Sequence, residues 1–340
     1  MDLPQPTSQD AQGTPSGETT LDAKVELPRY DRRRVIADVR ELSRVNPWRS
    51  TWMIGFNWIV IAAACVGAVW SGQWWAYLLA ILVIGTRQHA LTVLMHEGSH
   101  YLLYRNRVVN DVVCDLFCAF PMAMSTTLFR ATHVKHHLYT NTDQDPDFQQ
   151  WEQDPGWTRW PKQSWGQCVW VVLQSLLGLN VWKGTSLFLR WNPTANMFRP
   201  LGPDLPLLTR VLFVTSLSAF YAAIIMSGQL VNALILMLVP TFTVLNLLLR
   251  MRATADHVGV ANTHELNMTR TIEPGWLDRL LFSAHGVTYH IEHHLFPSVP
   301  CSNLKRLHAV LLEDEQYCRE AHVTSGFGGM FRELMEQSAS

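Results

Sequence analysis

The sequence predicts an all-α integral membrane protein, with four transmembrane helices in two hairpins and a cytosolic helical cap that holds a histidine-rich metal site. Two pairs of long apolar runs predict the hairpins, and three short histidine motifs beside the ends of those runs predict the site. Charged residues make up only 16% of the 340 residues, against about 25% in an ordinary soluble protein. The deficit of charge falls in the apolar runs, which is typical of a chain that crosses a membrane.

Two segments precede the apolar runs. Residues 1–28 are rich in Pro, Gln, Ser, Thr and Gly and contain no apolar run, which predicts a disordered tail rather than a signal peptide. Residues 29–50 contain seven arginines, interleaved with Val35, Ile36, Val39 and Leu42. This second pattern predicts a basic amphipathic helix that lies along the membrane and anchors the chain by its positive charge.

The membrane domain is expected to span residues 51–320, followed by a C-terminal tail at 321–340. Runs 52–70 and 74–95 are separated only by Ser71-Gly72-Gln73, and runs 207–226 and 230–249 only by Ser227-Gly228-Gln229. Each run is close to the roughly 20 residues that a helix needs to cross a bilayer. Because such short connections cannot recross a membrane, each pair must form a helical hairpin.

The charges at the ends of the hairpins predict how the protein lies in the membrane. Neither hairpin tip carries a charge, whereas arginines and a lysine flank the opposite ends. Since positive segments stay on the cytosolic side, we expect a multi-pass protein with both termini, the insert 101–206, the segment 250–320 and the histidine motifs in the cytosol. In a bacterium this would be the inner membrane. The net charge of −1 gives no indication of a nucleic-acid partner.

The insert between the hairpins contains two shorter apolar segments. Residues 111–120 predict a short helix packed under the membrane. Residues 166–182 are apolar but contain Gln167, Gln174 and Ser175, which favours an interfacial or re-entrant helix over a span. A true span there would place the histidine motifs on opposite sides of the membrane. The tryptophans between 151 and 165 predict a loop anchored at the membrane interface.

The histidine motifs have the spacing of one helix face. Residues three and four apart lie on the same side of a helix, and this relation groups His96 with His100; His133 with His136 and His137; and His290 with His293 and His294. His257 stands alone just beyond the fourth apolar run. Neutral imidazole is a common metal ligand. Nine imidazoles are too many for one ion, and they fit two ions with four or five ligands each.

Other residues have a lesser part in this prediction. The second ring nitrogen of a ligating histidine usually bonds a carboxylate, for which Glu97, Asp145, Asp256 and Glu292 are the neighbouring candidates. The isolated His89, His264, His308 and His322 are expected to be ordinary core or surface residues. The six cysteines lack the spacing of a disulfide framework or an iron–sulfur site.

With these motifs, the chain resembles the membrane fatty acid desaturase and hydroxylase superfamily over about residues 50–315. The segments 132–147 and 289–300 are very similar to the second and third histidine boxes of that superfamily. The resemblance implies a non-haem di-iron centre held by the nine histidines, with O2 as co-substrate and a lipid or fatty acyl chain as substrate. It also implies an external electron donor of the ferredoxin or cytochrome type, with its reductase.

The motifs of this chain differ from those of two branches of the superfamily, which argues against both branches. Acyl-CoA desaturases have HxxxxH as their first box and an Asn four residues before the isolated His, whereas this chain has HxxxH and Ala253. Front-end desaturases have Gln in place of His290 and a fused haem motif, His-Pro-Gly-Gly, which is missing here. We therefore predict an O2-dependent fatty acid desaturase. Hydroxylation, carotenoid ketolation or hydroxylation, and decarboxylation of a fatty acid to a 1-alkene remain open as alternatives.

Two rival functions are compatible with parts of the pattern. Residues 96–100 also match H-E-x-x-H of zinc proteases, in which Glu97 would be the general base, but that function leaves at least six histidines unexplained. A metal transporter should carry its ligands near the middle of the membrane, whereas these motifs lie at the ends of spans.

In the desaturase interpretation, Trp70, Trp74 and Phe242 are candidates to line a narrow acyl tunnel, with core packing as the alternative.

Overall fold

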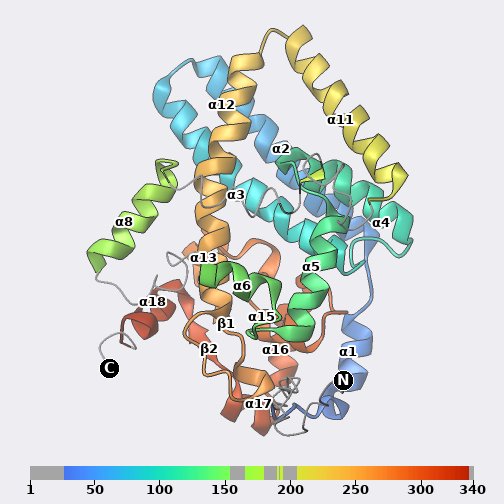
Figure 1. Cartoon of the computed structure of the whole chain (residues 1–340), viewed down its shortest axis with the longest axis vertical. Helices are drawn as coiled ribbons and strands as arrows, with labels where there is room; N and C mark the ends of the chain where they lie inside the picture. Colours follow the sequence, from blue (N-terminus) through green and yellow to red (C-terminus); the bar gives the residue numbers. More distant parts are fainter. Residues whose placement is uncertain (1–26, 154–164, 180–189, 191, 194–204, 337–340) are drawn as a thin grey trace, which may run out of the picture.

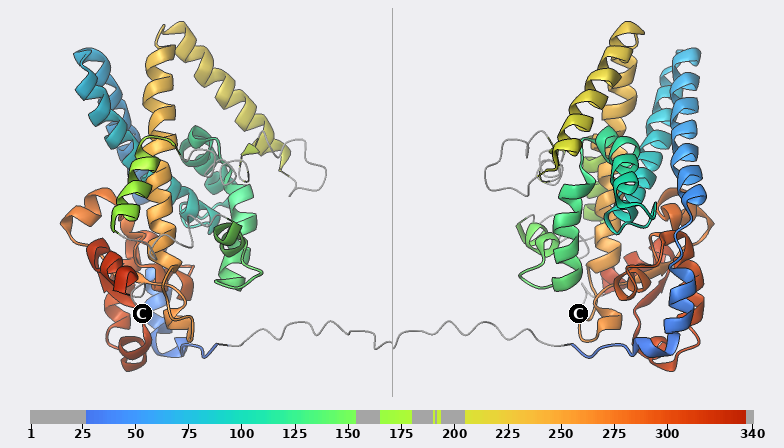
Figure 2. Two further views of the ribbon diagram at one scale, coloured as in Figure 1. Left: turned by 60° about the vertical axis from the view of Figure 1, so that its left-hand side comes forward. Right: turned by 90° about the vertical axis from the view of Figure 1, so that its right-hand side faces the viewer.

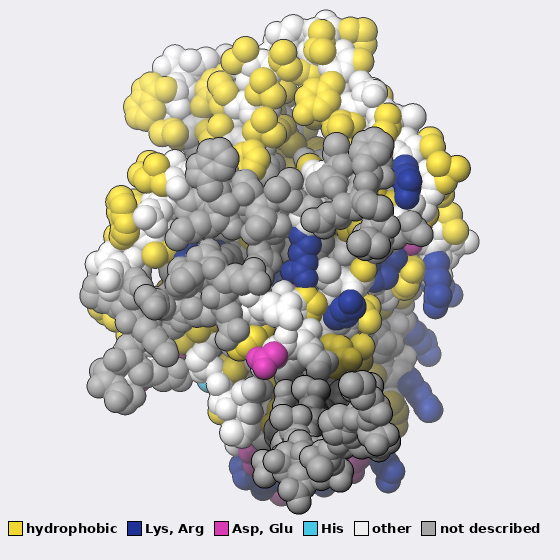
Figure 3. Space-filling model, in the orientation of Figure 1, with side chains coloured by type: hydrophobic (Ala, Val, Ile, Leu, Met, Phe, Trp, Pro, Cys, Tyr) yellow, Lys and Arg dark blue, Asp and Glu magenta, His cyan; other side chains and the backbone are white. Residues whose placement is uncertain are grey.

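The computed structural model describes residues 27–153, 165–179, 190, 192–193 and 205–336. The molecule is elongated, with two helical hairpins at one end and a cap of short helices at the other (Figures 1 and 2). Hydrophobic side chains gather on the surface of the hairpin end, and lysines and arginines lie below them (Figure 3). This division of the surface is the one that a bilayer requires.

The first hairpin consists of α2 (Pro47–Ser71) and α3 (Trp74–Ser99). The Asn46 side chain accepts a hydrogen bond from the Arg49 N–H, and Pro47 occupies the first turn, which together fix the start of α2. Gly72 ends it in the left-handed conformation, with φ 62°. Helix α3 continues to Ser99, beyond the apolar run, and so carries the first histidine motif on its last turn.

The second hairpin consists of α11 (Leu207–Met226) and a long helix from Leu230 to His257. The long helix comprises α12 (Leu230–Pro240), the π-helix η4 (Thr241–Leu245) and α13 (Asn246–His257). Pro240 has no N–H to donate, which accounts for the irregular turn that follows it. With α2, α3 and α11, this helix is long and apolar enough to cross a membrane, so the four predicted spans are confirmed.

The insert forms a sharply bent pair of helical segments. Helix α4 (Arg107–Cys114) continues through the π-helix η2 (Asp115–Ala119) and η3 (Phe120–Met122), and α5 (Thr126–Tyr139) then departs at 92°. Helix α6 (Pro146–Gln153) follows α5. The bend directs α5, with the second histidine motif, into the cap.

The second apolar segment of the insert forms α8 (Trp165–Leu176), whose 12 residues are too few to cross a bilayer. Residues 180–182 of the predicted segment, and the tryptophans at 157 and 160, lie outside the described residues. The described part therefore agrees with a short helix rather than a span.

The cap combines the N-terminal segment with the chain after residue 257. It contains the following elements in order: η1 (Arg32–Val35), α1 (Ile36–Leu42), η5 (Glu265–Asn267), β1 (Thr271–Glu273), α14 (Trp276–Leu281), η6 (Ala284–Gly286), α15 (His290–Leu295), α16 (Cys301–Leu311), α17 (Glu315–Glu320), β2 (Val323–Ser325) and α18 (Gly326–Glu336). The predicted all-α fold holds except that β1 and β2 pair as a short parallel ladder, from Thr271 opposite Val323 to Glu273 opposite Ser325.

The amphipathic segment near the N-terminus differs from expectation. Its apolar residues Val35, Val39 and Leu42 are buried in one cluster with Leu304 and Leu307 of α16. The helix therefore packs against the cap instead of lying along the membrane, because its apolar face covers the apolar side of α16. Most of its arginines are exposed, whereas Arg32 is half-buried and donates to Glu265 and to the carbonyl of Leu295.

Gly98 allows α3 and α4 to approach closely beside the first histidine motif. A Cβ atom at this position would overlap the sulfur of Cys114. We expect Gly98→Ala to lower the stability of the protein by about 1–3 kcal/mol, because overpacking forces the two helices apart. The measurement is thermal unfolding in detergent.

The matched control is Gly67→Ala on α2, where nothing lies within 4 Å of the added Cβ. That variant should be neutral or more stable by about 0.5–1 kcal/mol, since alanine favours helix. Equal behaviour of the two variants would contradict the close contact between α3 and α4.

Candidate metal centre

Four helical segments from distant parts of the sequence bring the nine predicted histidines together at the junction of hairpins and cap. The end of α3 supplies His96 and His100, α5 supplies His133, His136 and His137, the end of α13 supplies His257, and α15 supplies His290, His293 and His294. The side chains form two groups, one of five and one of four, and within each group the potential ligand atoms lie within 4.8 Å of one another.

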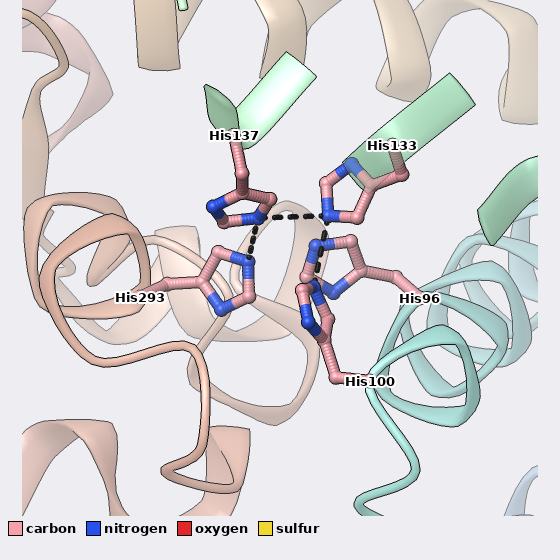
Figure 4. Close-up of side chains that lie close together, drawn as sticks. All are labelled: His96, His100, His133, His137 and His293. Carbon is pink, nitrogen blue, oxygen red and sulfur yellow. Dashed lines mark hydrogen bonds between the residues drawn. The ribbon is translucent and has the colours of Figure 1, made fainter. Parts of the chain in front are cut away.

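The group of five contains His96, His100, His133, His137 and His293 (Figure 4). The Nε2 atom of His133 lies 3.0 Å from the Nε2 atoms of both His100 and His137. The Nε2 atom of His137 is also 3.0 Å from that of His293. Imidazole rings from three different helices thus point their outer nitrogens at one small volume.

Hydrogen bonds alone cannot account for these short distances. A ring nitrogen has either one hydrogen or one lone pair, so it can take part in one hydrogen bond within the ring plane. The Nε2 atoms of His133 and His137 each have two such neighbours, and at most two of the three contacts can be hydrogen bonds. At least one pair of nitrogens therefore meets without a proton between them, as ligands of a common cation do.

The same site fits a metal ion by distance and by its unpaired atoms. Two nitrogen ligands bound at about 2.1 Å and at right angles lie about 3.0 Å apart, which is the observed separation. Both ring nitrogens of His96 are buried without a hydrogen-bond partner among the described residues. Unpaired buried nitrogens are costly unless a ligand satisfies them.

The group of four contains His136, His257, His290 and His294. The Nε2 atoms of His290 and His257 are 3.0 Å apart, and the ring centroids of His136 and His257 are 4.7 Å apart. The rings of His137 and His294 stack at 4.3 Å and so join this group to the first one. The two groups are neighbours that share α5 and α15.

The electrostatic surroundings keep the histidines of α15 neutral. Burial lowers the pKa of His290, His293 and His294 well below the usual histidine value, and the neighbouring imidazoles lower it further. A neutral imidazole has a free lone pair at neutral pH, as metal binding requires.

Three of the four predicted carboxylates lie beside a histidine of the two groups. Asp145 is fully buried and accepts the Nδ1–H of His136 at 2.9 Å, which directs Nε2 of that ring toward the group of four. Asp256 lies 3.6 Å from Nδ1 of His290, and Glu97 lies 3.8 Å from Nδ1 of His96. Asp145 is thus the carboxylate with the geometry of a supporting hydrogen bond.

Glu292 has a different partner from the one predicted. Its buried carboxylate accepts hydrogen bonds from Thr271 Oγ1 at 2.6 Å and from His308 Nδ1 and Tyr317 Oη at 2.5 Å. Because Glu292 is on the face of α15 opposite the histidines, it ties that helix to β1, α16 and α17. Burial lowers the pKa of His308, but the hydrogen bond and charge of Glu292 outweigh this and raise the pKa.

The isolated histidines have the ordinary roles expected of them, with one exception. His264 accepts the N–H of Leu266, His308 pairs with Glu292, and His322 pairs with Glu333 at 3.1 Å. His89 is buried within α3, and neither of its ring nitrogens has a hydrogen-bond partner among the described residues. Among the described residues it is therefore not a satisfied core histidine.

Sequence reasoning missed two contributors to the site and its surroundings. The ring of Phe129 stacks on that of His133, with their centroids 4.9 Å apart. Because residues four apart lie on the same face of a helix, the spacing on α5 could have indicated this contact. His285 lies 3.2 Å from the buried amide of Asn57, which also accepts from Arg87 at 3.4 Å. The polar Asn57 within an apolar run was a signal for this second contact, although its partner could not be read from the sequence.

The fold and the site define a histidine-rich integral membrane protein with two adjacent groups of imidazoles at one end of its membrane helices. The chain belongs to the fatty acid desaturase family, whose sequence model matches residues 72–325. Membership of this family makes it an oxidoreductase.

Three relatives illustrate the range of the family. The chain is 26% identical to the dihydrorhizobitoxine desaturase of Bradyrhizobium elkanii, over 80% of this chain and 77% of that protein. It is 26% identical to the sn-1 oleoyl-lipid 12-desaturase of Synechocystis sp., over 75% and 73% respectively. It is 21% identical to the chloroplastic omega-6 fatty acid desaturase of Brassica napus, over 89% of this chain and 66% of that protein.

The hydrogen bonds of Glu292 predict that His308 contributes strongly to the stability of the protein, although it belongs to neither histidine group. Replacing His308 with Ala leaves the buried carboxylate without its cationic partner, which should lower stability by about 3–5 kcal/mol. The measurement is thermal unfolding in detergent. His322→Ala removes a half-exposed partner of Glu333 and should cost less than about 1 kcal/mol. Similar losses in both variants would contradict the anchoring role of Glu292.

Proposed function

We propose that this protein is an O2-dependent desaturase of lipid acyl chains, with one iron ion held by the group of five histidines and a second held by the group of four. The convergence of nine imidazoles in two adjacent groups carries the proposal. The desaturases among its relatives support the type of reaction. Bound iron would supply the oxidation of an unactivated C–H bond with O2, a chemistry for which redox-inactive zinc is unsuitable.

The chain's own residues would prepare this chemistry by fixing the ligands. Asp145 holds the ring of His136 from behind, and Asp145 is itself fixed by the backbone N–H groups of Asn141 and Asp147 at 3.0 and 2.9 Å. Glu292 holds α15, whose six residues are too few to form a stable helix alone. These contacts support a site that is formed before metal binds, which reduces the cost of binding.

The proposed setting is the cytosolic face of the membrane. The uncharged hairpin tips and the arginines at the opposite ends support this orientation. In that position the cap would face a soluble electron carrier of the ferredoxin or cytochrome type, which would deliver the two electrons that desaturation with O2 requires.

The geometry does not favour the zinc protease. A protease base must face the metal-bound water, whereas Glu97 Oε2 accepts the N–H of Cys301 at 2.7 Å and the carboxylate is almost fully buried. A transporter is disfavoured because the histidine groups lie at the ends of α3 and α13 and in the cap, away from the middle of the membrane helices.

An apolar cavity of about 1040 Å³ among the membrane helices could receive the acyl chain. It is lined by α2, α11, α12 and the η2–η3 segment, and its wall includes Phe242, Met122 and Ala123. The last two residues lie just before α5, which carries His133. Phe242 thus has the position expected of a tunnel residue, whereas Trp70 and Trp74 are at the exposed hairpin tip and do not line this cavity.

Filling the cavity should impair the reaction. Gly55 lines it, and nothing lies within 4 Å of a Cβ added there. We expect Gly55→Leu to lower kcat/KM for long acyl chains about tenfold or more, because a side chain would occupy the space of several methylene groups. Gly67→Leu on the same helix also has open space but lies outside the cavity, so it should retain activity. Equal activity of the two variants would exclude this cavity as the acyl site.

The reaction itself is tested by mass spectrometry of lipids from a host that expresses this chain or its His136→Ala variant. We expect acyl chains that have lost two hydrogens in the first host only, since His136 belongs to the group of four. Gain of one oxygen would instead indicate hydroxylation, and loss of the carboxyl carbon would indicate alkene formation. Unchanged product formation by the variant would contradict the proposed site.

A further inference from the structure

A second cavity lies where the first membrane helix meets the cap. Its volume is about 450 Å³. The lining comes from the end of α1 and its following turn, the first turn of α2, the end of α3 and the start of α16. The cavity is distinct from the apolar one, with which it shares none of its lining residues.

The mouth of this cavity is basic. Arg44, Arg49 and Arg306 line it and are all exposed. Neither Arg44 nor Arg49 forms an ion pair with another described residue. Arg306 has only a loose contact of 3.8 Å with the exposed Glu41, and such surface pairs contribute little. The three guanidinium groups are thus available to an anion.

The floor of the cavity adds further groups that favour an anion. Ser302 and Asn303 line it at the first turn of α16, an 11-residue helix whose N-terminal end carries partial positive charge. Two carboxylates also line the cavity, the exposed Glu41 and the almost fully buried Glu97. Glu97 accepts the N–H of Cys301, so its charge is offset by the same helix end, and Glu41 lies 3.8 Å from Arg306.

The position of the cavity identifies the source of the anion. Pro47 begins the first membrane helix, and Trp48 and Trp52 beside it are 85% and 66% exposed. Exposed tryptophans at a helix end are typical of the level of lipid head groups. The volume suits a head group, whereas a protein carrier needs a broad surface of about 800 Å².

We propose that this cavity binds the phosphate group of a membrane phospholipid through Arg44, Arg49 and Arg306. Guanidinium groups bind phosphate by paired, charge-assisted hydrogen bonds. None of the nine histidines lines this cavity, and binding of a phospholipid there does not require turnover at the histidine groups.

The test compares the full-length protein with the double variant Arg44→Gln, Arg49→Gln in detergent, by native mass spectrometry. We expect the Kd for phosphatidylglycerol to rise about tenfold or more in the variant, because two charge-assisted contacts are lost. A galactosyl diacylglycerol without phosphate should bind weakly and equally to both proteins. Inorganic phosphate alone should not displace the bound phospholipid at equal concentration.

A matched control removes two exposed arginines elsewhere, Arg105→Gln with Arg107→Gln, and should bind phosphatidylglycerol as the unmodified chain does. Equal affinity in the Arg44 and Arg49 variant would overturn the proposal, as would tight binding of inorganic phosphate alone. Unchanged lipid binding together with slower reduction by an acidic electron carrier would overturn it as well, by assigning the arginines to that carrier.

Discussion

The structure depends on the packing of nine imidazoles, six of them buried, around two small volumes. Buried ring nitrogens without partners would destabilise the fold by about 1–3 kcal/mol each, and charged imidazoles so close together would repel. Binding of metal would remove both costs, because the lone pairs that cannot share protons would become ligands. The contacts between His133 and its neighbours are those expected of a set of metal ligands.

The two helices that carry most of these histidines are held in place by hydrogen bonds to carboxylates outside the two groups. Helix α5 is held through His136 and the buried Asp145, and the short α15 through Glu292 and its three donors. The cap that supplies those donors is closed by α1, whose apolar face packs on α16. Next to this contact, Arg44 and Arg49 line the cavity at the start of α2.

Much of this could be predicted from the sequence because it follows local periodicity. The four spans follow from runs of apolar residues, and the grouping of the histidines on helix faces follows from spacings of three and four. The partner of Glu292, the packing of α1 and the lack of a partner for His89 among the described residues could not be predicted, because each depends on how segments far apart in the chain are arranged. The division of the nine histidines into five and four also required the three-dimensional arrangement.

We infer that the two histidine groups hold two metal ions. The most direct measurement is the metal content of the purified protein, by elemental analysis together with Mössbauer spectroscopy. We expect two iron ions per chain, falling to about one when His100 of the group of five or His257 of the group of four is replaced by Ala. A single bound zinc ion, or a metal content that neither substitution changes, would contradict it.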